Sequence, residues 1–306
     1  MATRSLQELF VDRLRQLERF RKSLEGSSGR KIILVAAGPG MGKSWLLRRF
    51  VQESSARGAR SVLLDFSDGQ AYDVLTLVRR FRDALGPEYF NRLTAAINEA
   101  TAPRLVISDD GEPGPGAQLN FAGAQLGDVT IGEVAGRTIV KDNLFIVQTD
   151  NPLLLQAIED RVTQAFFACL ADLTAATSAL FLFDSYERTS QEEGERWVAN
   201  AADRWIQREL LSRIRDGRLT NTVVVLAGRR LPSFDAEWAG VVGQLPLELF
   251  TVEDVAQYLR ENRQLAALTD GEVQTLYSAI QGNPQLLGII GDNLEQAQRP
   301  VADDEW

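Results

Sequence analysis

The sequence predicts an α/β protein with a doubly wound parallel sheet, followed by a small helical domain. Three observations support this fold class. Short apolar runs alternate with helical patterns along most of the chain, a glycine-rich turn follows the first apolar run, and only helical patterns follow residue 250. Strands that alternate with helices favour a parallel sheet, because the chain must return to the start of the sheet before it pairs again.

The first hundred residues follow this α/β pattern. Leucine and phenylalanine recur at steps of three and four residues over 4–25, which is typical of an amphipathic helix. Gly58 ends a second helix, and Gly86 with Pro87 separates two further helices. In order, we expect a helix at 4–25, a strand at 31–37, a helix at 43–57, a strand at 61–66, and helices at 73–85 and 88–100.

The segment 103–150 interrupts the pattern. Glycine and proline crowd residues 111–116, and short stretches of alternating apolar and polar residues follow, separated by Gly127, Gly132 and Gly136. Alternation is typical of half-buried strands, and glycines between them mark turns. We therefore expect a β-hairpin or meander inserted into the first domain.

The α/β pattern resumes after the insertion and gives way to helices near residue 250. The apolar run at 179–184 is of the kind that parallel sheets bury on both faces. Capping-box spacing at Thr251 and Thr269, and Pro284 at a first helical position, predict three helices in the last part of the chain. We expect a helix at 152–176, a strand at 179–184, a charged helix at 191–214, strands at 222–228 and 241–249, and two domains, 1–249 and 250–306.

Residues 37–45 carry the strongest functional signal. They read Ala-Gly-Pro-Gly-Met-Gly-Lys-Ser-Trp and match the phosphate-binding pattern G-x-x-x-x-G-K-[ST], except that Ala37 replaces the first glycine. Glycines let backbone N–H groups converge on a phosphate, and the following helix adds its positive end. Lys43 is placed to reach the β- and γ-phosphates, and the Ser44 hydroxyl to bind Mg²⁺. The residues expected to contact a nucleotide here are Gly38, Pro39, Gly40, Met41, Gly42, Lys43, Ser44 and Trp45.

Three charged residues at strand ends add to this site. Asp184 ends the apolar run 179–184, where a carboxylate can hold Mg²⁺ or its water shell together with Ser44. Glu187 follows three residues later and can activate a water molecule, unless it is a solvated loop residue. Arg229 follows the strand 222–228 and can contact a γ-phosphate, with Arg230 as the substitute candidate. Lys43, Glu187 and Arg229 are therefore the candidate catalytic residues.

Composition narrows the function. The 306 residues carry a formal net charge of −9, which argues against nucleic acid as the main partner. Histidine is absent and Cys169, in an apolar run, is the single cysteine, which excludes His-dependent catalysis, disulfide scaffolds and cysteine zinc sites. The sequence has neither a signal segment nor an apolar run long enough for a membrane helix, so we expect a cytoplasmic protein without a membrane partner.

Several motifs, taken in order, resemble those of the STAND ATPases (signal-transducing ATPases with numerous domains), P-loop proteins related to the AAA+ initiators. Phe10-Val-Asp-Arg13 resembles an N-terminal Phe-Val-Gly-Arg motif whose residues, here Val11 and Arg13, line the adenine pocket in the family. The segment Leu180–Glu187 resembles a Walker B motif, and Ala227-Gly228-Arg229 resembles the sensor arginine strand. Gly282-Asn-Pro284 resembles a motif in which the proline, here Pro284, touches the nucleoside.

The resemblance implies an AAA+-like P-loop fold that binds ATP or ADP with Mg²⁺ and acts as a regulatory switch with slow hydrolysis. It also implies self-association or a protein partner in one nucleotide state. Two alternatives stay open. One is a nucleotide-dependent protein-binding module with negligible turnover, and the other is an AAA+-like DNA-associated ATPase, which the acidic composition disfavours.

Overall fold

The structure is a computed structural model that describes residues 13–70, 72–101, 152–193 and 196–297. The chain divides into two compact units, one formed by Met1–Gln70 with Thr177–Trp306 and the other by Ala71–Ala176. The insertion expected at 103–150 and residues 4–12 of the first expected helix lie outside the described residues.

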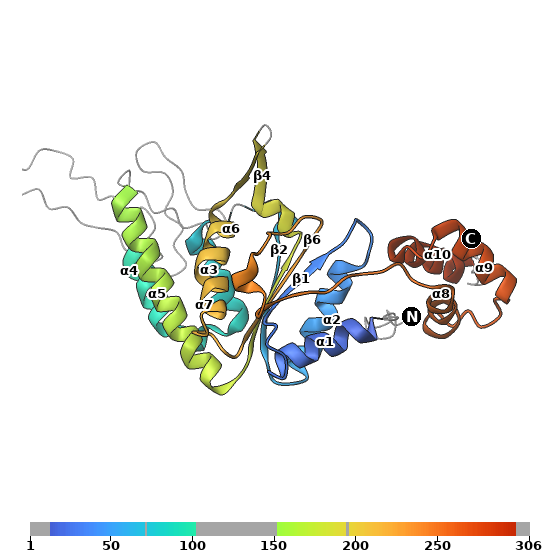
Figure 1. Cartoon of the computed structure of the whole chain (residues 1–306), viewed down its shortest axis with the longest axis horizontal. Coiled ribbons are helices and arrows are strands. Elements are labelled where there is room, and N and C mark those ends of the chain that lie inside the picture. The colour runs from blue at the N-terminus through green and yellow to red at the C-terminus, as the bar shows by residue number, and fades with distance from the viewer. Residues whose placement is uncertain (1–12, 71, 102–151, 194–195, 298–306) are drawn as a thin grey trace, which may run out of the picture. The chain divides into compact units, whose positions relative to one another are not determined.

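The first unit contains a parallel sheet. In the described part of the chain five strands pair in the order β2-β3-β6-β1-β7, with every pairing parallel. This sheet confirms the predicted α/β class (Figure 1). The last expected strand is shorter than predicted. The strands are β1 (Ile32–Ala36), β2 (Arg60–Asp65), β3 (Ala179–Asp184), β6 (Thr222–Gly228) and β7 (Val242–Gln244).

Both faces of the central strands are buried, which explains their continuous apolar sequences. Every residue of β3 and β6 is buried. Helices α1 (Leu14–Leu24) and α2 (Lys43–Ser55) pack on one face, where the rings of Phe20 and Phe50 stack with centroids 4.0 Å apart. Figure 1 shows α6 and α7 on the opposite side of the sheet.

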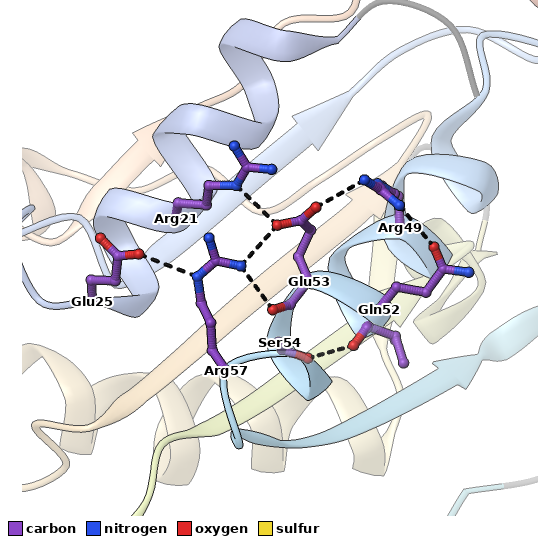
Figure 2. Close-up of polar contacts among 8 residues, drawn as sticks. Arg21, Glu25, Arg49, Gln52, Glu53, Ser54 and Arg57 are labelled. Atoms are coloured by element: carbon purple, nitrogen blue, oxygen red, sulfur yellow. Dashed lines mark hydrogen bonds and ion pairs between the residues drawn. The ribbon is translucent and has the colours of Figure 1, made fainter. Parts of the chain in front are cut away.

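A cluster of charges joins α1 to α2. The carboxylate of Glu53 accepts from Arg21 of α1 at 2.9 Å and from Arg57 at 2.8 Å, and it forms an ion pair with Arg49 at 3.0 Å. Figure 2 shows the three guanidinium groups converging on this carboxylate, with Glu25 paired to Arg57 at the left. The side chain of Glu53 is only 9% exposed, so this Glu53 network fixes α1 against the helix that follows the glycine-rich turn.

The structure corrects the helix predicted at 191–214. Strands β4 (Ser190–Glu193) and β5 (Arg196–Ala199) form an antiparallel hairpin instead. Gly194 disfavours a helix there and Trp197 and Val198 favour a strand, whereas the prediction weighed charge alone. The helix begins only after Asn200, whose side chain accepts from the N–H of Asp203. It comprises α6 (Ala201–Trp205), a π-helical segment Ile206–Leu211 and α7 (Ser212–Arg215).

The second unit is helical in its described residues. It contains α3 (Val74–Leu85), a 3-10 turn Pro87–Tyr89, α4 (Asn91–Thr101) and α5 (Pro152–Ala176), as predicted. Phe166 of α5 packs against Phe81, Phe90 and Phe167 with ring centroids 5.1–5.7 Å apart. Among the described residues no helix combines the length and the apolar composition that a membrane span requires.

The last part of the chain is helical and has its own hydrophobic cluster, which includes Leu259, Val273 and Leu287. Both predicted capping boxes are present, with Thr251 and Thr269 accepting from the backbone three residues later. The elements are α8 (Val252–Gln257), a π-helical segment Tyr258–Asn262, α9 (Asp270–Ile280) and α10 (Pro284–Ala297).

Candidate functional site

The glycine-rich turn between β1 and α2 depends on two of its glycines. Gly40 and Gly42 have φ values of +72° and +81°, a region that side chains other than glycine rarely adopt. Gly38 has neither a positive φ nor a heavy atom within 4 Å of the position a Cβ would take. The backbone shape of the turn therefore depends on positions 40 and 42, which leaves Ala37 compatible with it. The N–H of Ala37 donates to the carbonyl of Gly228 at 3.2 Å and joins the turn to β6.

Lys43, the first residue of α2, folds back over this turn. Its Nζ donates to the carbonyl oxygens of Ala37 and Gly38 at 2.9 and 2.7 Å. Burial lowers the pKa of Lys43, while the negative charges of Glu187 and Asp184 act in the opposite direction. The ammonium group is thus held at the mouth of the turn, within the field of both carboxylates.

Asp184 ends β3 beside this lysine. Its buried carboxylate is hydrogen-bonded to the Ser44 hydroxyl, and its Oδ1 accepts from the N–H of Ser185 at 2.9 Å. Burial raises the pKa of Asp184, and the charge of Asp65 adds to the rise, against the lowering effect of Ser44 and Ser185. Burial and the nearby Asp65 both disfavour the negative charge of this carboxylate. Together with the Ser44 hydroxyl it offers the oxygen ligands that suit a divalent cation.

Asp65 was not among the predicted site residues. It ends β2 and lies directly opposite Asp184 in the parallel register. Burial alone would raise the pKa of Asp65, but hydrogen bonds from the backbone and side chain of Ser67 and from Ser185 give a net lowering. Its position as the only charged residue of the strand expected at 61–66, next to the end of that strand, is the sequence signal that would have identified it.

Glu187 and Arg229 meet across the ends of β3 and β6. Glu187 Oε1 accepts from Arg229 Nε at 2.8 Å, and Oε2 accepts from the Arg229 backbone N–H at 3.0 Å. A Cβ at Gly228 would lie 2.6 Å from Glu187 Oε2, so glycine is needed for this approach. Burial alone would raise the pKa of Glu187, but the Arg229 hydrogen bonds outweigh it and the net shift is downward. Glu187 is therefore a charged base held by an arginine.

The turn that carries Glu187 has an unusual start. Ser185 has a φ of +52°, and the 3-10 turn Tyr186–Thr189 follows it. The Tyr186 hydroxyl donates to Asp203 at 2.6 Å. Burial, with the charge of Asp203, raises the pKa of Tyr186 well above its usual value, so the hydroxyl stays protonated.

The start of α10 contacts the glycine-rich turn. The N–H of Gln285 donates to the Gly40 carbonyl at 3.1 Å, and a Cβ at Gly40 would lie 2.6 Å from Gln285 Oε1. Pro284 begins α10 and lies near Gly42, with 3.8 Å between its Cβ and the position of a Cβ there. Asn283 caps α10 by accepting from the N–H groups of Gln285 and Leu286. Asn283 and Gln285, like Asp65, were missed, because the Gly282-Asn-Pro284 motif assigns a nucleoside contact to its proline alone.

The remaining predicted residues are placed as follows. Arg13 is buried, with its guanidinium 5.0 Å from the centre of the Phe250 ring, whose N–H donates to Gly282 at 2.9 Å. Met41 packs against the hydrophobic cluster under α2, so its contribution to a ligand would come from its backbone. Pro39 and Trp45 are exposed. Val11 lies outside the described residues.

The structure is similar to several solved structures at low identity. One is a STAND protein with a tetratricopeptide repeat sensor from Pyrococcus horikoshii, with 12% identity, a TM-score of 0.45, and coverage of 96% of this chain and 31% of that one. Another is Cdc6p from Pyrobaculum aerophilum, with 10% identity, a TM-score of 0.47, and coverage of 97% and 67%. A third is AMPPCP-bound DnaA from Aquifex aeolicus, with 14% identity, a TM-score of 0.42, and coverage of 96% and 68%.

The STAND class, which the sequence motifs resemble, is thus among the structural neighbours, although this chain spans only 31% of that protein. No protein-family model matches the sequence. No curated protein matches it either.

Proposed function

We propose that the chain binds ATP and Mg²⁺ at the C-terminal edge of its sheet and hydrolyses ATP slowly, as a regulatory switch of the STAND type. The observation that carries this proposal is the convergence of four parts of the site at one edge of the sheet. The glycine-rich turn, Lys43, the Ser44–Asp184 pair, and the Glu187–Arg229 pair lie at neighbouring strand ends and interact with one another. Each supplies one of the parts that phosphoryl transfer from a nucleotide requires.

The contacts of Lys43 support phosphate binding. Its ammonium group is bonded to two neutral carbonyls, which are weaker partners than phosphate oxygens. The oxygens of a triphosphate would replace these carbonyls as acceptors and form charge-assisted hydrogen bonds with Lys43. The N–H groups of the turn and of the start of α2 would hold the β-phosphate. The turn is therefore expected to bind the anion by exchanging contacts that already exist.

The Ser44–Asp184 pair fits Mg²⁺. Both groups are oxygen ligands, and the raised pKa of Asp184 indicates a carboxylate that a cation would stabilise. Bound Mg²⁺ would neutralise negative charge on the β- and γ-phosphates during the reaction. Asp65, opposite Asp184, adds negative charge to the same edge of the sheet.

The Glu187–Arg229 pair supports both hydrolysis and its slowness. In hydrolysis Glu187 accepts a proton from the water that attacks the γ-phosphorus, while the bond to the β-phosphate oxygen breaks and ADP leaves. Arg229 lowers the pKa of Glu187 and so weakens this base. When ATP is bound, its γ-phosphate would compete with Glu187 for Arg229. Movement of Arg229 to the γ-phosphate would then free Glu187 to act as a base.

The contacts of α10 support a switch. Because Gln285 donates to Gly40 and Pro284 lies near Gly42, a ligand that moves the turn also acts on the helical segment. A conformational effect of this kind requires different nucleotide affinities in the two arrangements. Self-association or binding of a protein partner in one nucleotide state is part of this proposal.

One observation favours the alternative, a nucleotide-dependent protein-binding module with negligible turnover. The candidate base is fully engaged by two N–H groups of Arg229. If Arg229 does not leave Glu187 when ATP binds, the chain retains ATP without hydrolysing it. Hydrolysis measurements separate the two functions.

Two variants test the proposal. Lys43→Ala should weaken ATP binding at least about 100-fold in calorimetric titration, because it removes two charge-assisted phosphate contacts. Glu187→Gln should keep ATP affinity within about twofold and slow phosphate release about 100-fold, the usual contribution of a general base. Unchanged ATP affinity in Lys43→Ala would disprove the binding site. ATP retention without phosphate release in the wild type would favour the binding module.

A further inference from the structure

Tyr186, which directly precedes Glu187, is anchored more firmly than packing requires. Tyr186 is 2% exposed, and its ring lies edge-on to Phe66 and Phe183 with centroids 6.0 and 6.2 Å apart. Its hydroxyl crosses to α6 and donates to Asp203 Oδ1 at 2.6 Å. The aromatic neighbours restrict the ring, and the hydroxyl bond fixes how far the ring enters the core.

Asp203 is itself held in place. Its carboxylate is 4% exposed and also accepts from Gln207 Nε2 at 2.8 Å. Its backbone N–H donates to the capping side chain of Asn200 at 2.9 Å. The acceptor for Tyr186 is thus a rigid point at the start of a helix.

A buried carboxylate is a costly way to stabilise a core. Apolar groups of similar size often stabilise a fold as well as a buried polar pair does, without the loss of hydration. The Tyr186–Asp203 hydrogen bond instead fixes the orientation of the Tyr186 side chain, because a hydrogen bond of 2.6 Å allows little movement of the phenol.

Contacts of the backbone on the way to Glu187 restrict the position of Glu187 as well. Ser185 turns the chain with a positive φ, and Thr189 Oγ1 donates to the Tyr186 carbonyl at 2.8 Å. The Tyr186 side chain and carbonyl are therefore both tied, immediately before the peptide bond that leads to Glu187. These ties place the backbone of Glu187, and the hydrogen bonds from Arg229 hold its carboxylate.

We propose that Tyr186 and Asp203 are positioning residues that hold the Glu187 carboxylate in line with the water that attacks the γ-phosphate. The inference rests on the proposed function, in which Glu187 activates that water. Neither residue touches the nucleotide, so both act on the rate of hydrolysis and leave ATP affinity unchanged.

The main test is Tyr186→Phe, which removes one oxygen and keeps the ring. The rate constant for hydrolysis of bound ATP should fall about tenfold or more, since small displacements of a reacting group have effects of this size. The Kd for ATP should stay within about twofold. Asp203→Asn keeps an oxygen acceptor, so its rate constant for hydrolysis should fall less than that of Tyr186→Phe. Asp203→Leu removes the acceptor, and its rate constant should fall as much as that of Tyr186→Phe.

A matched control separates positioning from general stability. Tyr258 is another buried tyrosine, and its hydroxyl accepts from Arg263 Nε at 2.7 Å within the helical segment. Tyr258→Phe removes a hydrogen bond of similar length to a charged partner, away from Glu187. It should lower the melting temperature as Tyr186→Phe does and leave the rate of hydrolysis unchanged.

The decisive measurement repeats Tyr186→Phe in the Glu187→Gln background, in single-turnover hydrolysis of radiolabelled ATP. With the base removed, its position no longer matters, so the second substitution should have no further effect on the rate. An equal loss in both backgrounds, or a wild-type rate in folded Tyr186→Phe, would overturn the inference and leave the role of Glu187 intact. A wild-type rate in Glu187→Gln alone would overturn the proposed function and the inference together.

Discussion

Two carboxylates in the same unit, Glu53 and Glu187, both bind arginine but in different ways. Glu53 lies between two helices and pairs with three arginines, as Figure 2 shows, whereas Glu187 lies at a sheet edge and pairs with one. The partner of Glu187, Arg229, is 56% exposed, whereas Arg49 in the Glu53 network is 20% exposed. A carboxylate that is surrounded by partly buried arginines holds its two helices together. A carboxylate that is held by a single exposed arginine can give up that arginine to a ligand.

The largest expected effect is the loss of folding stability when Glu53 is replaced. Glu53→Gln should lower the free energy of unfolding by about 2 kcal/mol, because three partly buried arginines lose their common counter-ion. ATP affinity should not change, since the network lies at the far end of α2 from Lys43. Urea unfolding and calorimetric titration measure the two quantities.

Glu18→Gln is the control for this variant. Glu18 is paired with Lys22 one turn along α1 and is 63% exposed, so its loss should leave stability within experimental error. If Glu53→Gln is as stable as Glu18→Gln, the Glu53 network is not structural and the comparison fails.

The next effect is on ligand preference at Arg229. Arg229→Ala should reduce the preference for ATP over ADP about tenfold, the value of one hydrogen bond between charged groups. The free energy of unfolding should stay unchanged, because the side chain is half exposed. Arg230→Ala is the matched control and should keep the preference. A loss of preference in Arg230→Ala instead would move the sensor role to the adjacent residue.

The smallest effect is the pH dependence of the Glu53 network. Hydrogen bonds from Arg21 and then Arg57 lower the pKa of Glu53, against the effect of burial. Because the folded-state pKa lies below the unfolded value of about 4.3, the stabilisation is complete above that value and is lost as the pH falls through the folded pKa. The stability difference between wild type and Glu53→Gln should therefore be constant near neutral pH and shrink in acid. A difference that persists unchanged to about pH 2 would show that the charge of Glu53 is not its source.

The sequence predicted the fold wherever the signal was local. The buried strands β3 and β6, the turn at 37–45 and the capping boxes each depend on neighbouring residues, and all are present in the structure. The first part of the helix predicted at 191–214 was wrong, because the prediction did not weigh Gly194 and the strand-forming residues after it, whereas residues 201–214 are helical as predicted. The insertion expected at 103–150 stays a prediction, as do the two domains at 1–249 and 250–306.

The site was harder to predict where it depends on pairing between distant segments. Asp65 faces Asp184 only through the register of β2 with β3, and neither residue carries a sequence pattern that gives this register. The hydrogen bonds between Glu187 and Arg229 likewise join strand ends that are 42 positions apart. The sequence indicated each residue separately, and the sheet determines which of them meet.

The β4–β5 hairpin has a consequence for engineering this protein. At its base the N–H of Asn200 donates to the carbonyl of Thr189 at 2.8 Å, so the chain leaves and re-enters the core at one point. The peptide between these residues is a side branch, whose length does not alter the path of the core. A fluorescent reporter or an epitope tag inserted between β4 and β5 should therefore be tolerated, and it would report from the hairpin that directly follows the turn that carries Glu187.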